Sequence, residues 1–143
     1  MKRIILYTER EELSHEQDHL GEFGPKARQN AISAAAVILA QQIPAKVIIT
    51  ETATGQTARN ISSLRPSVPI IMATHSRRVY QQLAIVWGGK SYLHSKPREA
   101  TDHVIAQLKS AGNVAKGDAL VLASGHQPGV SGGTDTVTIK VVQ

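Results

Sequence analysis

Apolar side chains recur at helical spacing in the first regular segment of the chain. After Pro25 they fall mostly three or four residues apart, at Ile32, Ala35, Ala36, Leu39, Ala40 and Ile43. Because 3.6 residues complete one turn of an α-helix, this spacing predicts a helix with one buried face. Proline suits the first helical turn at Pro25 and cannot continue a helix at Pro44. The prediction is therefore a helix over residues 25–43.

Short apolar runs and helical segments alternate along the next part of the chain. Four segments are predicted to be strands, at Val47–Thr50, Pro69–Thr74, Ser91–His94 and Leu120–Ala123. The first is a short β-branched run of the kind found in a buried parallel strand. Helical spacing predicts three helices between them, over about residues 55–64, from an N-cap at Ser76 to Trp87, and from Pro97 to a stop at Gly112. Trp87 is expected to pack into the core at its helix end.

The last segment, Val137–Val141, alternates apolar and polar residues as a half-exposed strand does. It follows the run at 120–123 without a helix, and a parallel return needs a long crossover, so the two strands must be antiparallel if they pair. The whole pattern predicts an α/β protein, a three-layer α/β/α sandwich on a five-stranded mixed sheet with the last strand antiparallel. At a sheet edge, that strand would be a candidate for pairing across a dimer axis.

The length of 143 residues is that of one ordinary domain. Residues 25–143 carry the α/β pattern, whereas residues 9–24 are polar and contain glycines, so residues 1–24 are predicted to be an N-terminal helix or linker. The run Ile4–Tyr7 is ambiguous between strand and helix. No cysteine occurs, which excludes thiolate chemistry and disulfides and favours a reducing, cytoplasmic setting. No apolar run approaches the roughly 20 residues of a membrane span, and no membrane partner is expected.

Charge is distributed unevenly behind the net value of +5. The first 25 residues hold six carboxylates and three basic side chains, whereas no carboxylate occurs between Thr52 and Arg98. That stretch contains only basic charges, at Arg59, Arg65, Arg77, Arg78, Lys90, Lys96 and Arg98. Its field should attract an anionic ligand. The few aromatic residues are not interleaved with the basic ones as stacking platforms would be, which argues against nucleic acid as a partner.

Two loops are expected where ligands collect in an open α/β sheet, beyond the carboxyl ends of the strands. Residues 50–57 combine several hydroxyls with Gly55 at a helix N-terminus, where free N–H groups and the helix dipole favour an anion such as phosphate. Simple capping by Thr54 or Thr57 explains the same residues equally well. The segment lacks the lysine of a P-loop, so nucleoside triphosphate hydrolysis is not indicated. The second loop, residues 125–136, is rich in glycine, which lets a backbone approach a ligand closely.

Several motifs in this order resemble the C-terminal domain of pyruvate kinase. The first is Thr-x-Thr-Gly-x-Thr-Ala-Arg at residues 52–59, followed by Arg65-Pro66 and by Pro69-Ile70-Ile71. Further matches are the stretch Gln82-Leu-Ala-Ile-Val-Trp-Gly-Gly89, the turn Lys116-Gly117-Asp118, and the closing loop that ends Gly133-Thr134-Asp135-Thr136. The resemblance runs from about Pro25 to the C-terminus. The start, residues 1–9, is also similar to the helix that precedes this domain, which favours helix there and suggests a piece of a longer enzyme over a chain encoded alone.

The resemblance implies a regulatory role without catalysis. Phosphoryl transfer in that family takes place in a TIM barrel that this sequence does not contain, whereas the C-terminal domain makes subunit contacts and, in many members, binds a sugar phosphate effector. The phosphate-binding residues would be Thr52, Thr54, Gly55, Gln56 and Thr57. The effector loop would include Gly125, His126, Gly129, Ser131, Gly132, Gly133 and Thr134. The expected partners are a phosphorylated small molecule and a second copy that associates through the C-terminal strand; no cofactor or metal is expected.

The sequence departs from the family pattern at two places, and the second of them changes the expected ligand. Asp135 stands where an asparagine is usual, and Thr101 and Asp102 fall near the place of the arginine that grips a second phosphate. Lys96 and Arg98 are close enough in sequence to substitute for it. The sequence therefore favours a monophosphate over a bisphosphate.

Histidines offer the alternative of a small enzyme that acts on a phosphorylated metabolite. His75 follows a predicted strand and His126 lies in the glycine-rich loop, so either could serve as an acid–base group. No acidic residue near them in sequence would orient the ring. His15 and His19 have a spacing that binds metal on a helix, but in a polar linker they are expected to be solvated.

Overall fold

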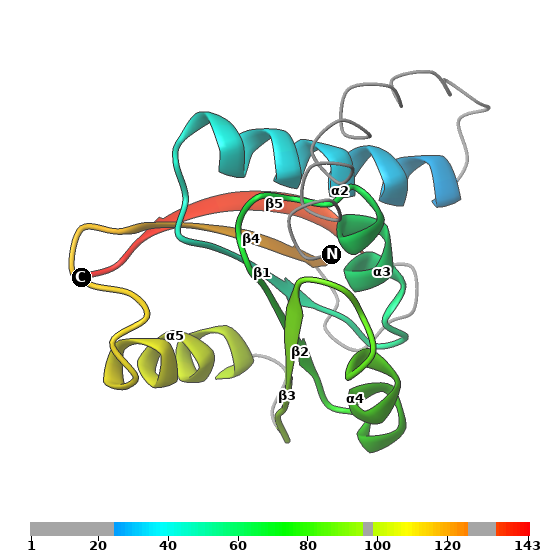
Figure 1. The fold of residues 1–143 in the computed structure, drawn as a ribbon. Helices are drawn as coiled ribbons and strands as arrows, with labels where there is room; N and C mark the ends of the chain where they lie inside the picture. The colour runs from blue at the N-terminus through cyan, green and yellow to red at the C-terminus, as the bar shows by residue number, and fades with distance from the viewer. Residues whose placement is uncertain (1–24, 96–98, 126–133) are drawn as a thin grey trace, which may run out of the picture.

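The computed structural model describes residues 25–95, 99–125 and 134–143. Its helices are α2 (Pro25–Gln42), α3 (Gln56–Ser63), α4 (Arg77–Leu83) and α5 (Ala100–Ser110). Its strands are β1 (Val47–Glu51), β2 (Ile70–Thr74), β3 (Gly89–Leu93), β4 (Ala119–Gly125) and β5 (Thr134–Val141). Strands and helices alternate up to β4, as the sequence predicts (Figure 1).

The strands form one mixed sheet in the order β3-β2-β1-β4-β5. The first four are mutually parallel, and β5 runs antiparallel to β4. The predicted fold class and the direction of the last strand are both confirmed. Because β3 and β5 pair on one side only, they are the two edges of the sheet.

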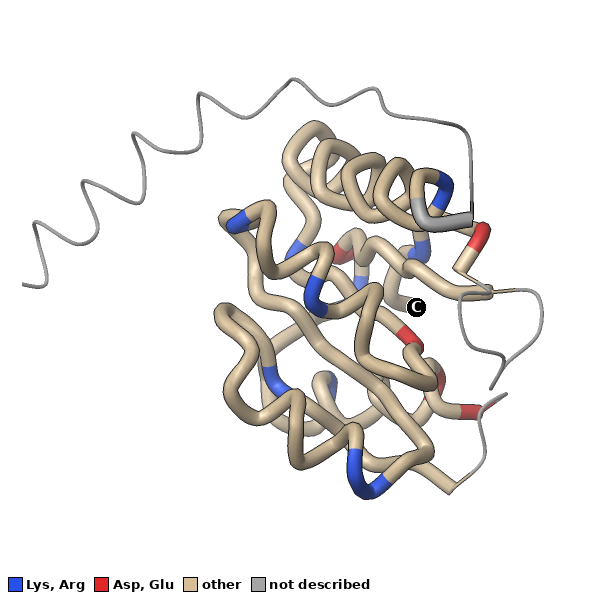
Figure 2. The backbone as a smooth tube through the Cα atoms, turned by 90° about the vertical axis from the view of Figure 1, so that its right-hand side faces the viewer, with Lys and Arg blue, Asp and Glu red and all other residues tan. Residues whose placement is uncertain are grey.

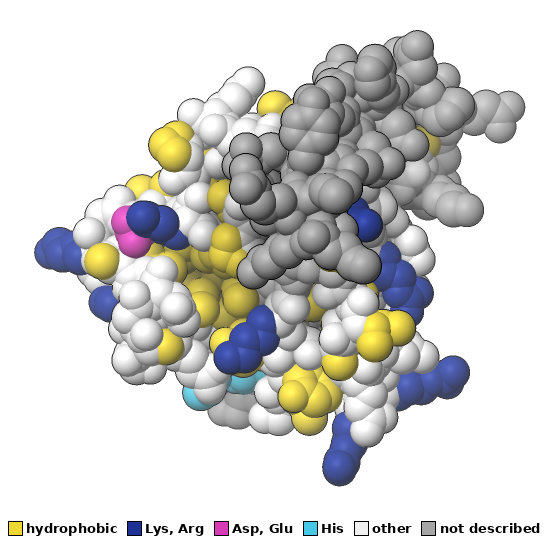
Figure 3. Space-filling view, in the orientation of Figure 1, with side chains coloured by type: hydrophobic (Ala, Val, Ile, Leu, Met, Phe, Trp, Pro, Cys, Tyr) yellow, Lys and Arg dark blue, Asp and Glu magenta, His cyan; other side chains and the backbone are white. Residues whose placement is uncertain are grey.

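One face of the sheet packs against three helices. Helices α2, α3 and α4 cover the face to which β1 and β2 contribute Ile48, Ile70 and Met72, all fully buried. Alternation of side chains along each strand turns Ile49 and Ile71 to the opposite face. Of the described helices, α5 covers this face, through Ala100, Val104, Ile105 and Leu108, which completes the three layers. Hydrophobic side chains gather in a hollow between α5 and the sheet (Figure 3).

The buried face of α2 differs in part from the sequence prediction. Ala36 and Ala40 are buried as expected, but Ala35 is exposed. Gln29 and Ser33 are buried instead, and the Ser33 hydroxyl donates to the Gln29 carbonyl at 2.8 Å. Polar residues on this face are tolerated because they find hydrogen-bond partners there. A prediction from apolar spacing alone misses them.

The predicted packing of Trp87 is wrong. Helix α4 ends at Leu83, earlier than the sequence indicated, and Trp87 lies in the following turn with 39% of its surface exposed. The Arg65 guanidinium carbon lies 4.5 Å from the centroid of the indole ring. The indole ring of Trp87 is thus in a cation–π contact with Arg65 and is not packed in the core. The Ser76 N-cap is confirmed, since its side chain accepts a hydrogen bond from the Val79 N–H.

The predicted helix or linker over residues 1–24 lies outside the described residues. In the part of the chain that is described, none of the helices has both the length and the apolar composition needed to cross a bilayer.

Candidate functional site

The segment between β1 and α3 forms a tight turn at the carboxyl end of the sheet. The Thr52 hydroxyl accepts a hydrogen bond from the Gly55 N–H at 2.8 Å, which folds the turn back on itself. Gly55 has φ +83°, a left-handed conformation that glycine adopts without strain. A Cβ at this position would lie 3.2 Å from Leu83 of α4, so the turn also approaches that helix closely. Thr52 and Gly55 therefore give the turn its shape.

The N-terminus of α3 carries free hydrogen-bond donors. The first helical bond runs from Arg59 N to Gly55 O at 3.0 Å, so the N–H groups of Gln56, Thr57 and Ala58 precede it. Within the described residues no side chain caps this helix, so the alternative of simple threonine capping is not what the structure shows. Thr54 and Gln56 are exposed beside these donors. The arrangement can accept an anion with the helix dipole behind it.

A buried chain of hydrogen bonds joins this helix to the base of the glycine-rich loop. The Thr57 hydroxyl lies 2.7 Å from the Thr134 hydroxyl and accepts a bond from the Gln29 amide at 3.0 Å. Thr134 in turn pairs with Gly125 at the ends of β5 and β4. The structure thus brings together the two predicted segments at the residues where each is anchored. Sequence analysis did not single out Gln29, because a lone glutamine within a helical pattern gives no signal of burial.

The hydroxyls of Thr57 and Thr134 have a structural role in this arrangement. Thr57 is 1% exposed and Thr134 is 6% exposed, and each is bonded to the other. The hydroxyl of Thr57 is thus used within the protein, and its backbone N–H precedes the first helical hydrogen bond. Seven other predicted site residues lie outside the described residues, namely Lys96, Arg98, His126, Gly129, Ser131, Gly132 and Gly133.

The first turn of α5 holds Thr101 and Asp102, the two residues at which the sequence departs from the expected site. The Thr101 hydroxyl donates to the Glu51 carboxylate at the end of β1. Asp102 forms an ion pair with Lys140 of β5 at 2.5 Å. Both side chains therefore have partners within the protein, and neither adds positive charge to the candidate site.

Basic side chains dominate the neighbouring helices. Figure 2 faces the side of α3 and α4, and the segment from β2 to β3 carries Lys and Arg without any Asp or Glu. Arg59 on α3 and Arg77 and Arg78 on α4 are exposed, so their charge is available to attract an anion in solution.

The histidines show no catalytic arrangement in the described part of the chain. His75 is exposed after β2, and no described carboxylate is placed to orient its ring. His94 and His103 lie with ring centroids 5.0 Å apart. Among the described residues, no group of three or more His, Asp or Glu side chains is placed to hold a metal ion. His15 and His19 lie outside these residues.

The strand order and the uncapped helix at the carboxyl edge define an open α/β domain with a candidate anion site. Residues 30–140 match the family described as pyruvate kinase, alpha/beta domain. The chain belongs to this family, and the sequence-based recognition is confirmed.

The curated relatives are larger proteins. Pyruvate kinase from Clostridium acetobutylicum is 37% identical over 82% of this chain and 26% of its own length. Pyruvate kinase 2 from Synechocystis sp. is 32% identical over 100% of this chain and 24% of its own length. A crystal structure of a pyruvate kinase from Cryptosporidium parvum superposes with a TM-score of 0.75, 27% identity, and coverage of 100% of this chain and 27% of that one. The chain thus spans about a quarter of the length of these relatives.

Proposed function

We propose that this chain is a regulatory domain that binds a phosphorylated metabolite and has no catalysis of its own. The observation that carries the proposal is the uncapped N-terminus of α3, where three backbone N–H groups lie beside the exposed Thr54. Phosphate oxygens are strong acceptors, and a helix N-terminus offers both donors and a favourable dipole. In this proposal Thr52 and Gly55 hold the turn in shape, and Thr54, Gln56 and the backbone of Thr57 would contact the phosphate.

The remainder of the ligand would meet the glycine-rich loop. That loop leaves β4 at Gly125 and returns at Thr134, which contacts Thr57 of α3. The proposal therefore assigns the sugar attached to the phosphate to the residues between these two points, namely His126, Gly129, Ser131, Gly132 and Gly133. Lys96 and Arg98, which come after β3 in the sequence, would supply positive charge.

A single phosphate is the proposed ligand group. Thr101 and Asp102 have partners within the protein, so the first turn of α5 offers no cation for a second phosphate. The proposal accordingly favours a sugar monophosphate over a bisphosphate.

A thermal-shift titration tests this site. Glucose 6-phosphate, ribose 5-phosphate, AMP, fructose 1,6-bisphosphate and inorganic phosphate are compared on the wild type and on Thr54→Ala. A ligand at about 100 times its dissociation constant adds about 2.7 kcal/mol to the free energy of unfolding. We expect a saturable rise for one sugar monophosphate that is lost in Thr54→Ala. Ser63→Ala, which removes an exposed hydroxyl at the other end of α3, is the control and should bind as the wild type does.

Two other outcomes would contradict the proposal. Absence of any shift would remove the phosphate site. Conversion of the ligand, followed by chromatography and abolished by His75→Ala or His126→Ala, would establish the alternative of a small enzyme.

Self-association through β5 is the second part of the proposed role. This edge strand presents Ile139 and Val141 with about half of each side chain exposed, 50% and 54%. Its outer backbone groups and these apolar side chains would pair with a second copy across a twofold axis. Sedimentation velocity should show a dimer that Ile139→Lys abolishes. Ile85→Lys is the control. It changes an isoleucine that is 91% exposed and is not part of β5, and it should leave the dimer intact.

A further inference from the structure

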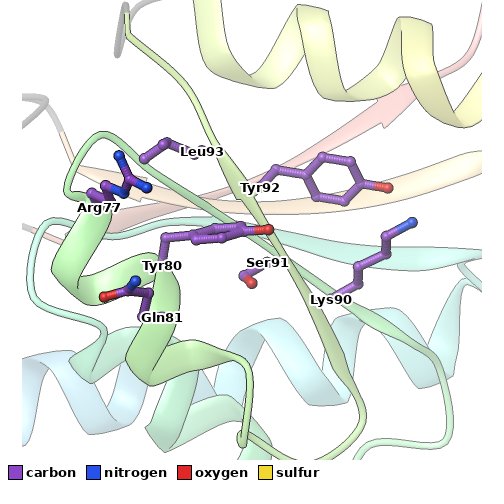
Figure 4. Close-up of a pocket in the computed structure, with 7 residues that line it drawn as sticks. All are labelled: Arg77, Tyr80, Gln81, Lys90, Ser91, Tyr92 and Leu93. Carbon is purple, nitrogen blue, oxygen red and sulfur yellow. The ribbon is translucent and has the colours of Figure 1, made fainter.

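A groove runs along the opposite edge of the sheet, between β3 and α4 (Figure 4). Helix α4 contributes Arg77, Tyr80 and Gln81, and β3 contributes residues 90–93. The groove encloses about 470 Å³. Among the described residues, none of those proposed for the phosphate site or for the β5 interface lines it.

The backbone of β3 is free on the groove side. Ile70 N donates to Gly88 O, and His94 N donates to Thr74 O, each at 2.9 Å. In a parallel pair, alternate residues of one strand turn both backbone groups to the same neighbour, so the even-numbered residues of β3 face β2. Gly89, Ser91 and Leu93 therefore direct their N–H and C=O groups outward. Among the described residues, no strand lies beyond β3 to receive them.

Side chains flank this edge on both faces of the sheet. On one face Lys90 Nζ lies 5.2 Å from the centroid of the Tyr92 ring. On the other, Tyr80 reaches from α4 toward β3 and is 37% exposed, and Leu93 is 49% exposed. A strand added at this edge would set its alternate side chains against Lys90 and Tyr92 on one face and against Tyr80 and Leu93 on the other.

We propose that this groove binds an extended, acidic segment of a partner polypeptide, which adds to the sheet as a strand beside β3. Main-chain hydrogen bonds to Ser91 and Leu93 would supply affinity, as in other cases of strand addition, and the flanking side chains would supply specificity. The charge of the groove selects carboxylates, since Lys90 and Arg77 line it and the chain holds no Asp or Glu between residues 52 and 98. The preferred segment alternates acidic residues, which face Lys90, with apolar residues, which face Tyr80 and Leu93.

A second copy of this chain fits the groove less well. Pairing two β3 strands would bring two sets of Lys90 and Arg77 together without a carboxylate between them. Lysine on an edge strand discourages pairing with a like strand for this reason. An acidic strand removes the repulsion.

Fluorescence polarisation with designed peptides tests the proposal. The probe is a labelled peptide of four Glu-Val repeats, compared with four Lys-Val repeats and with a Glu-Val peptide that carries a central proline. We expect saturable binding of the first peptide alone. Ser91→Pro removes an outward N–H and no bond to β2, and should weaken binding at least tenfold. Lys90→Glu should reverse the preference in favour of the Lys-Val peptide.

A proline at the other edge of the sheet provides the matched control. Val142 N donates to Asp118 O, and Lys140 lies opposite Leu120, so Ile139 directs its N–H away from β4. Ile139→Pro should leave peptide affinity unchanged while it impairs the proposed β5 dimer. Circular dichroism measures whether each variant is folded. If a proline variant is unfolded, the Lys90→Glu charge reversal serves as the test.

Three results would overturn the proposal. The first is that the Glu-Val peptide does not bind. The second is that this peptide binds the wild type, Ser91→Pro and Lys90→Glu with equal affinity. Alternatively, the protein alone self-associates with rising concentration and Ser91→Pro abolishes that association, in which case a second copy occupies the groove.

Discussion

The hydroxyl oxygens of Thr57 and Thr134 lie 2.7 Å apart although 77 residues separate them in the chain. Gln29 joins them by donating its side-chain amide to Thr57, so that α2, α3 and β5 meet at one buried polar point. All three side chains are less than 10% exposed. This point fixes the base of the glycine-rich loop against the helix that carries the candidate phosphate site.

Removing the central hydroxyl should destabilise the fold. Thr57→Val keeps the shape of the side chain but leaves the Gln29 amide and the Thr134 hydroxyl buried without this partner. An unsatisfied buried group costs about 1–3 kcal/mol, and we expect the free energy of unfolding to fall by that amount in urea titrations. Thr57→Ser, which retains the hydroxyl, should lose less than Thr57→Val. Equal losses in the two variants would show that the hydrogen bonds contribute nothing.

The opposite result is expected at Thr50. This residue is fully buried in β1, and its hydroxyl has no hydrogen-bond partner among the described residues. Valine has nearly the same shape and no hydroxyl to desolvate, so Thr50→Val should raise the free energy of unfolding by about 1 kcal/mol. Chemical denaturation of the wild type and of Thr50→Val measures this difference in the free energy of unfolding. A loss of stability would mean that the hydroxyl is bonded in solution.

Gly55 should resist substitution for two separable reasons. Its φ of +83° strains any residue with a Cβ by about 1–2 kcal/mol, and the added Cβ would press on Leu83 at 3.2 Å. Gly112 shares the left-handed conformation, with φ +72°, but has nothing within 4 Å of an added Cβ. Gly55→Ala should therefore cost more stability than Gly112→Ala, as measured by thermal unfolding. Equal costs would assign the whole effect to the backbone conformation.

The contact between Arg65 and Trp87 should be measurable by a double-mutant cycle. An exposed cation above an aromatic ring contributes about 0.5–1 kcal/mol, and the separation here is 4.5 Å. The variants Arg65→Ala, Trp87→Leu and their combination give the coupling from three unfolding free energies relative to the wild type. Additive effects would mean that the two side chains do not interact in solution.

The elements of the fold followed from local patterns in the sequence. Helical spacing predicted the helices, and short segments between them predicted strands β1 to β4. Alternation predicted β5 as a half-exposed strand, and the lack of a helix between it and β4 predicted its antiparallel direction. These predictions are confirmed because an element that buries one side must carry apolar residues at its own structural period, 3.6 residues in a helix and 2 in a strand. The residues of the candidate phosphate site were recognisable for a similar reason, since the turn, the glycine and the helix that follows are contiguous at 52–59.

What the sequence did not reveal depends on residues that are distant along the chain. The burial of Gln29, the contact between Thr57 and Thr134, and the exposure of Trp87 each depend on where another element packs, and no local pattern encodes that position. The free edge of β3 is a further case, because the place of a strand in a sheet depends on which other strands pair beside it. Composition and periodicity therefore predicted which elements form, whereas the candidate anion-binding segment was indicated by its hydroxyls and glycine before a helix and by the family resemblance. The tertiary structure decided which polar groups are satisfied within the protein and which remain available to a partner, since that depends on the packing of the whole sheet.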